Sequence, residues 1–293
     1  SAGENPEVAA MAQGWKGQVD ISYLGPYGLT YDQVLTRSDF FLPLPQAGVQ
    51  EGNSLGELTA DAFAWAAQAL AGLPGEEPTV ALTADGVLRA PLPKGNITTA
   101  QVFDVLNVGS GGDGTAGSPL VACYLTGKEL RALLEVDATV SAWMPEAQLY
   151  LSGLEYTFNV RRVPFNKVTQ AVLPQTGEGP ESGQLYRVVT SLYCAQMLSA
   201  VEGRSFGLLS IVPKDESGAP VADLESRILY DRSGRELKEW YALAAYLQTF
   251  GGDGIPTSYA WPDGRKEVSR SWNPIELIKS PGQPTVGVRL AAA

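Results

Sequence analysis

Three capping boxes restrict where helices can begin in this chain of 293 residues. In a capping box, a Ser or Thr side chain accepts a hydrogen bond from the backbone N–H three residues later, and a Glu or Gln at that position bonds back to the cap. The pattern occurs at Thr98–Gln101, Thr126–Glu129 and Ser233–Glu236. Apolar residues at helical spacing follow each box, so each predicts a helix.

Candidate strands lie between these helices. An Ala-rich amphipathic helix is also expected from Leu55 to just before Gly72. Short apolar runs predict strands over residues 79–82, 120–125, 154–160, 186–190 and 206–212. Because the strands and helices do not alternate regularly, we predict an α+β fold in which helices flank a mixed β-sheet.

Glycine and proline suggest where the compact domain begins and ends. Residues 1–50 read as an irregular approach segment, and Ser1–Gly3 as a remnant of protein expression. The domain itself is expected over residues 51–255, and residues 256–293 as an extension that wraps its surface. No signal peptide follows the first residues, so we expect the chain to be a piece of a longer protein.

The chain has no histidine, which excludes several chemistries. Neither a Ser-His-Asp nor a Cys-His catalytic site can be built, and two cysteines alone do not make a zinc site. With 21 basic and 32 acidic residues the net charge is −11, which argues against nucleic-acid binding. No apolar run approaches the ~18 residues of a membrane span.

Two glycine-rich stretches have simple structural interpretations. Gly109–Gly114 matches G-x-G-x-x-G, but a capped helix precedes it and a strand follows, whereas a dinucleotide site needs the reverse order. We therefore expect a flexible loop without a cofactor role. Gly251–Gly254 follows a predicted helix and is interpreted as its C-cap and turn.

The two cysteines, Cys123 and Cys194, lie in apolar stretches far apart in the sequence. Buried free thiols are the favoured interpretation. A disulfide, which would suit an extracytoplasmic setting, stays open as the alternative.

Six segments in order resemble the C-terminal domain of the 5′-nucleotidase family. The first, Glu51–Ala62, resembles the signature E-S-N-L-G-N-L-x-A-D-A. The later segments lie at residues 84–89, 95–108, 125–135, 152–157 and 186–190. In that order they resemble N-G-G-I-R, G-x-I-T with D-V-L-P-F-G-N, L-T-G-x-x-L-x-x-x-L-E, S-G-L-x-Y and Y-x-V-V-T-N.

The resemblance implies a domain that recognises the nucleoside part of a nucleotide. In the family, a separate N-terminal metallophosphoesterase domain holds two divalent metal ions on His and Asp and performs the hydrolysis. The lack of His fits a chain without that domain, so no catalytic residue, metal or cofactor is expected here. The family also implies a periplasmic or cell-surface location.

The resemblance points to five substrate-binding residues. Arg89 closes the N-G-G-I-R segment, and its guanidinium suits an anionic or ribose oxygen. Two aromatic residues enclose the base in the family, and their positions fall on Val108 and Tyr193. Asp85 and Asn107 are expected to make polar contacts. The loop Asn107–Ser118 is longer than the family's, and the G-G-D-G that the family has a few residues after the second aromatic is missing here.

These departures leave two other functions open. The domain could be a degenerate scaffold or dimerisation domain that binds no nucleotide, or it could recognise a different small anionic substrate. Whether Arg89 and Tyr193 lie in one cleft separates binding from scaffolding.

Overall fold

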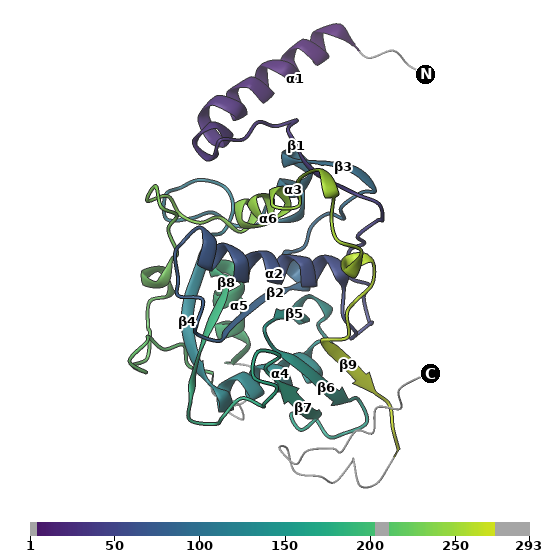
Figure 1. Ribbon diagram of the computed structural model, residues 1–293, viewed down its shortest axis with the longest axis vertical. Helices are drawn as coiled ribbons and strands as arrows, with labels where there is room; N and C mark the ends of the chain where they lie inside the picture. Colours follow the sequence, from purple (N-terminus) through teal and green to yellow (C-terminus); the bar gives the residue numbers. More distant parts are fainter. Residues whose placement is uncertain (1–4, 203–210, 273–293) are drawn as a thin grey trace.

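The computed structural model describes residues 5–202 and 211–272 (Figure 1). Its α-helices are α1 (Pro6–Val19), α2 (Ser54–Ala69), α3 (Thr99–Val105), α4 (Gly127–Val140), α5 (Leu192–Glu202) and α6 (Glu239–Gln248). Its strands are β1 (Val34–Ser38), β2 (Thr79–Ala84), β3 (Gly95–Thr98), β4 (Leu120–Thr126), β5 (Leu149–Ser152), β6 (Glu155–Asn159), β7 (Val168–Val172), β8 (Leu185–Ser191) and β9 (Lys266–Ser269).

A four-stranded sheet in the order β4-β8-β2-β5 forms the centre. β2 runs parallel to β8, with Thr79 opposite Arg187, whereas β4 and β5 run antiparallel to their neighbours. Smaller sheets are formed by β1-β3 and by β7-β6-β9. The predicted α+β fold with a mixed sheet is confirmed.

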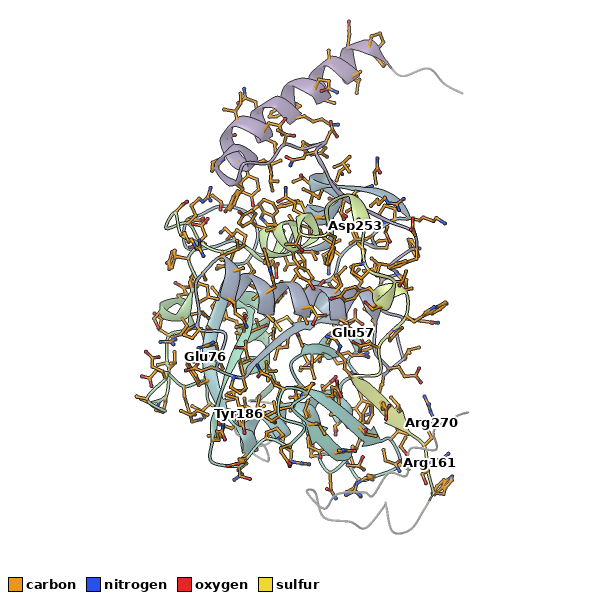
Figure 2. All side chains as sticks on the ribbon, viewed as in Figure 1. Glu57, Glu76, Arg161, Tyr186, Asp253 and Arg270 are labelled. Atoms are coloured by element: carbon orange, nitrogen blue, oxygen red, sulfur yellow. The ribbon has the colours of Figure 1, made fainter. Side chains whose placement is uncertain are left out.

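The central sheet is covered on both faces, so successive residues of its strands face different cores. In β2, Ala81 packs into a core shared with α2, α3 and α6, whereas Val80 and Leu82 pack into a second core shared with α4, β6 and β7. Figure 1 shows α2, α3 and α6 on one side of the central sheet, and α4 with the β7-β6-β9 sheet on the other. Figure 2 shows side chains filling both layers, with Glu57 on α2.

Two of the three capping boxes form as predicted. At α3, the Gln101 side chain accepts from the Thr98 N–H at 2.9 Å, and the Thr98 hydroxyl accepts from the Gln101 N–H at 3.4 Å. Thr126 and Glu129 make the same reciprocal pair at the start of α4. These bonds involve residues three apart in the chain, which is why the sequence alone reveals them.

The third predicted box is wrong. α6 begins at Glu239. Ser233 instead lies in a turn, where its N–H donates to the Asp231 carboxylate at 2.8 Å. The Glu236 carboxylate bonds to Asp113 and Lys238, so a contact with a residue distant in sequence replaces the local cap.

The strands predicted over 79–82, 120–125, 154–160 and 186–190 correspond to β2, β4, β6 and β8. Of the strand predicted over 206–212, residues 206–210 lie outside the described residues, and 211–212 are not in a strand. The expected Ala-rich helix is α2, whose Asn53 side chain caps its first turn.

The expectation that residues 4–50 lack regular structure is wrong in two places. The helix α1 covers Pro6–Val19 and buries none of its residues, and it projects from the body (Figure 1). The strand β1 pairs antiparallel with β3 and buries Leu35. The domain boundary at residue 50 stays a prediction, although β1 belongs to the folded body.

The C-terminal extension contributes a strand. β9 pairs in parallel with β6, and its Lys266 is buried and donates to the Asp137 carboxylate at 2.8 Å. The expectation of a surface wrap is therefore wrong for residues 266–269, while residues 273–293 lie outside the described part. Among the described helices, none is both long and apolar enough to cross a membrane.

The buried Lys266–Asp137 pair predicts a large stability effect. Lys266→Met leaves the Asp137 carboxylate buried without its cation, so we expect the free energy of unfolding to fall by about 3–5 kcal/mol in a urea titration. Arg270→Met is the matched control, because Arg270 pairs with Glu51 while both side chains are more than half exposed (Figure 2). We expect it to cost less than about 1 kcal/mol, and equal losses in the two variants would contradict the analysis.

Candidate functional site

Because β2 and β8 pair in parallel, the segments that directly follow these two strands lie at the same edge of the central sheet. Residues 85–89 follow β2 directly, and Tyr193 follows β8. β4 is antiparallel to β8 and begins opposite its last residue, so the loop 107–118 enters the sheet at this edge too. We call residues 85–89, 107–118 and 191–193 the carboxyl edge. Ligands of open α/β sheets commonly bind beyond the carboxyl ends of parallel strands.

Tyr193 and Val108 are linked through Ser118. The Tyr193 N–H donates to the Ser118 hydroxyl at 3.0 Å, and the Ser118 N–H donates to the Val108 carbonyl at 3.0 Å. A Cβ at Gly109 would lie 3.8 Å from the Tyr193 ring, so the ring covers this glycine. The two positions predicted to enclose a base therefore lie on neighbouring segments.

Arg89 and Asn107 both lie close to the end of α3. The Arg89 N–H donates to the Val105 carbonyl at 2.9 Å, and the exposed guanidinium makes a long bond of 3.4 Å to the Gly86 carbonyl. Asn107 is also exposed, and its side chain donates to Asp104 at 3.5 Å. Both side chains are open to solvent at this edge.

Asp85 faces a different part of the molecule. Its half-buried carboxyl interacts with Glu146 and Lys266, and its N–H donates to the Gln148 carbonyl at 2.8 Å. Burial, and then the Glu146 charge, raises the pKa of Asp85 to about 6. Among the described residues, no hydrogen bond or ion pair joins Asp85 to Arg89 or Tyr193. Four cavities described in the structure have none of the five predicted residues in their linings.

The glycine loop 109–117 is held by buried charges rather than free. Lys238, fully buried, donates to Asp113 at 2.8 Å and to Glu236 at 2.7 Å, and Glu236 also accepts from the Asp113 N–H at 3.0 Å. A Cβ at Gly111 would lie 1.7 Å from a Glu236 carboxylate oxygen and 2.3 Å from the Lys238 ammonium nitrogen, so a side chain here would displace this ion pair. The expected flexible loop is in fact an anchored one, and β4 follows it, as the argument against a dinucleotide site required.

A buried acid that the sequence analysis missed lies below the carboxyl edge. Glu239 is the first residue of α6, is fully buried, and its N–H donates to the Ser118 carbonyl at 2.9 Å. Neither carboxyl oxygen has a partner at hydrogen-bonding geometry among the described residues, although the Ser191 hydroxyl is close enough to favour ionisation. Burial dominates and raises the pKa of Glu239 to about 8. Its burial depends on tertiary packing, so no sequence signal marked it.

Cys123 and Cys194 are both free and buried, which confirms the favoured interpretation. Burial raises the pKa of each thiol to about 11, so neither is a reactive thiolate at neutral pH. In the described part of the chain, no group of three or more Cys, Asp or Glu side chains could hold a metal ion.

The comparison with protein families decides the identity of the fold. The model of the 5′-nucleotidase C-terminal domain matches residues 30–200, which is more than half of the chain. The chain belongs to the 5′-nucleotidase C-terminal domain family. No curated protein sequence is significantly similar to it.

Solved structures of nucleotidases share this fold. A 5′-nucleotidase precursor from Thermus thermophilus aligns with a TM-score of 0.57 at 23% identity, over 87% of this chain and 43% of its own. The NAD nucleotidase of Haemophilus influenzae aligns with a TM-score of 0.52 at 15% identity, over 91% of this chain and 42% of its own. The chain therefore spans less than half the length of these nucleotidases.

The family match extends the domain beyond the boundary expected at residue 51, because it begins at residue 30 and includes β1. It ends at residue 200, before the segment that contains α6. Three residues that bond to the loop 107–118 therefore lie outside the matched range, namely Glu236, Lys238 and Glu239.

Glu239 predicts how stability depends on pH. The folded chain keeps this proton up to about pH 8, whereas an unfolded Glu loses it near its ordinary pKa of 4.5. The native state thus binds more protons between these values, and the free energy of unfolding falls as the pH rises. Glu239→Gln removes this decline, so we expect the variant to be more stable than the wild type by about 1–3 kcal/mol at pH 8.

Urea unfolding at pH 5 and pH 8 measures this difference. Glu155→Gln, at an exposed position on β6, is the control and should follow the wild type at both pH values. If Glu239→Gln has the same pH dependence as the wild type, the buried acid is not held protonated.

Proposed function

We propose that this chain is the nucleotide- or nucleoside-recognition domain of a 5′-nucleotidase-like, metal-dependent phosphohydrolase. The observation that carries the proposal is that Ser118 links Tyr193 to Val108, and that the Tyr193 ring lies beside Gly109, where β2 and β8 end. By the resemblance, Val108 and Tyr193 are the positions at which the family encloses the base. The family match and the nucleotidase fold support the same function.

Each part of the carboxyl edge has a role in this proposal. The Tyr193 ring stacks on the base, because every base has a π-face and stacking needs no particular hydrogen-bond pattern. Val108 forms the opposite wall. Arg89, exposed and weakly bonded, turns its guanidinium to a ribose or phosphate oxygen, and Asn107 adds a polar contact. Asp85 does not contact the ligand directly in this arrangement.

Hydrolysis is assigned to a metallophosphoesterase domain outside this sequence. In that domain two divalent metal ions would activate water and stabilise the phosphate. In this proposal, the contribution of this chain is to bind and orient the nucleoside. We further propose a periplasmic or cell-surface location, which the family resemblance supports.

Two observations favour the scaffold alternative. Val108 replaces an aromatic residue of the family, and Arg89 already bonds within its own turn. A degenerate domain that positions or dimerises the catalytic domain would tolerate both features. The two functions differ in whether the chain binds a nucleoside at all.

Calorimetric titration of the chain with adenosine and AMP tests the proposal. We expect saturable binding that also raises the melting temperature, because a ligand of the folded state stabilises it. Tyr193→Ala removes a stack of about 1–3 kcal/mol and should weaken binding about ten-fold or more. Arg89→Ala should weaken AMP binding more than adenosine binding if the guanidinium meets the phosphate.

Two controls accompany these variants. Trp261→Ala removes an aromatic side chain that is 80% exposed, and Arg232→Ala removes an exposed arginine away from the carboxyl edge. Both should bind as the wild type does. A chain that unfolds cooperatively yet shows no saturable heat at millimolar ligand contradicts the recognition proposal and favours the scaffold.

A further inference from the structure

A separate cavity of about 630 Å³ lies against the glycine loop. The loop touches Tyr193 through Gly109, but it lines this cavity through Gly112 and Asp113. The other walls come from Tyr23 and Tyr27, which precede β1, and from the segment 225–236 that leads to α6. We call it the tyrosine cavity. Its volume is in the range of small-molecule sites.

The charges around the tyrosine cavity are predominantly negative. Asp113, Glu225 and Glu236 line it together with Arg235. Just behind this lining, Asp231 pairs with Arg235 at 2.7 Å and Lys238 serves both Asp113 and Glu236. The lining itself therefore has three carboxylates and one cation.

In the described part of the chain, a carboxylate without a paired cation lies at the mouth of the cavity. Glu225 is exposed, and no cation pairs with its carboxylate among the described residues. Although partial burial opposes it, hydrogen bonding from Lys238 and Thr115 holds the pKa of Asp113 below its ordinary value, so this carboxylate is ionised at neutral pH.

The tyrosine rings supply a second kind of contact for a cation. The Arg235 guanidinium already lies over the Tyr27 ring, 4.8 Å from its centre, which shows that this wall accommodates a planar cation. Tyr230 lines the cavity, is 50% exposed and makes no ring or cation contact in the described structure. A cation over a tyrosine ring is attracted by the negative face of the ring.

We propose that the tyrosine cavity binds a small organic cation, whose guanidinium or ammonium group lies over Tyr230 and pairs with Glu225 and Asp113. The carboxyl edge shares Asp113 with this cavity, but it differs where Gly109 lies beside the Tyr193 ring and where Arg89 is exposed. The net charge of −11 further favours cations near the surface. The proposal does not depend on nucleotide recognition.

Agmatine and choline are the probes, and 3,3-dimethyl-1-butanol is the uncharged analogue of choline. Binding is followed by calorimetry and by the NMR signal of the Trp240 indole N–H, which donates to the Tyr23 hydroxyl at 2.8 Å on the wall of the cavity. We expect both cations to bind saturably and to shift this signal, and the uncharged analogue to bind at least several-fold more weakly.

Variants at the cavity mouth locate the site. Tyr230→Ala and Glu225→Gln change exposed side chains, so folding is preserved, and each should weaken agmatine binding about three- to ten-fold. Tyr193→Ala and Trp261→Ala are controls that should leave agmatine binding unchanged.

Three results would overturn the proposal. They are no saturable binding of either cation at millimolar concentration, equal binding of the uncharged analogue, or unchanged affinity in Tyr230→Ala and Glu225→Gln. Loss of agmatine binding in Tyr193→Ala alone would also refute it, because it would move the cation to the carboxyl edge. Adenosine binding is measured separately, so either proposal can fail while the other stands.

Discussion

The parallel pairing of β2 with β8 is the interaction on which the candidate site depends. In a sheet whose other pairs are antiparallel, this one pair makes the two strands end at the same edge. At the opposite end, the buried Arg187 on β8 bonds to Glu77 and to the Pro74 carbonyl, just before β2 begins. A slip of one residue would reverse the faces of β2 and break both contacts, so the core and the ion pair specify one register.

The glycine loop takes part in both candidate binding sites. Lys238 has no exposure to solvent and must keep its two carboxylate partners, because a buried charge without a partner is costly. By holding Asp113 and Glu236 together, it fixes a loop whose one end touches Tyr193 and whose middle lines the tyrosine cavity. In the two proposals, a nucleoside binds near one end of this anchored segment and an organic cation near its middle.

The features that the sequence predicted are mostly local. The caps of α3 and α4 depend on bonds between residues three apart, and the strands on short apolar runs, so both could be read from the chain. Glu236 was misassigned because it accepts from Asp113 on another segment, and α1 was missed because it buries no face that a periodic pattern would reveal. The positions of Tyr193 and Arg89 came from motif resemblance, whereas the burial of Glu239 depends on packing that no local pattern encodes.

The most direct test of the account is to map adenosine binding on the backbone amides of the chain by heteronuclear NMR. If the carboxyl edge recognises nucleosides, the largest shifts fall together in residues 86–89, 107–118 and 191–193, three segments that are far apart in sequence and meet where β2 and β8 end. Shifts confined to other segments, or none at saturating adenosine in a folded chain, would contradict the claim that this edge is the binding site.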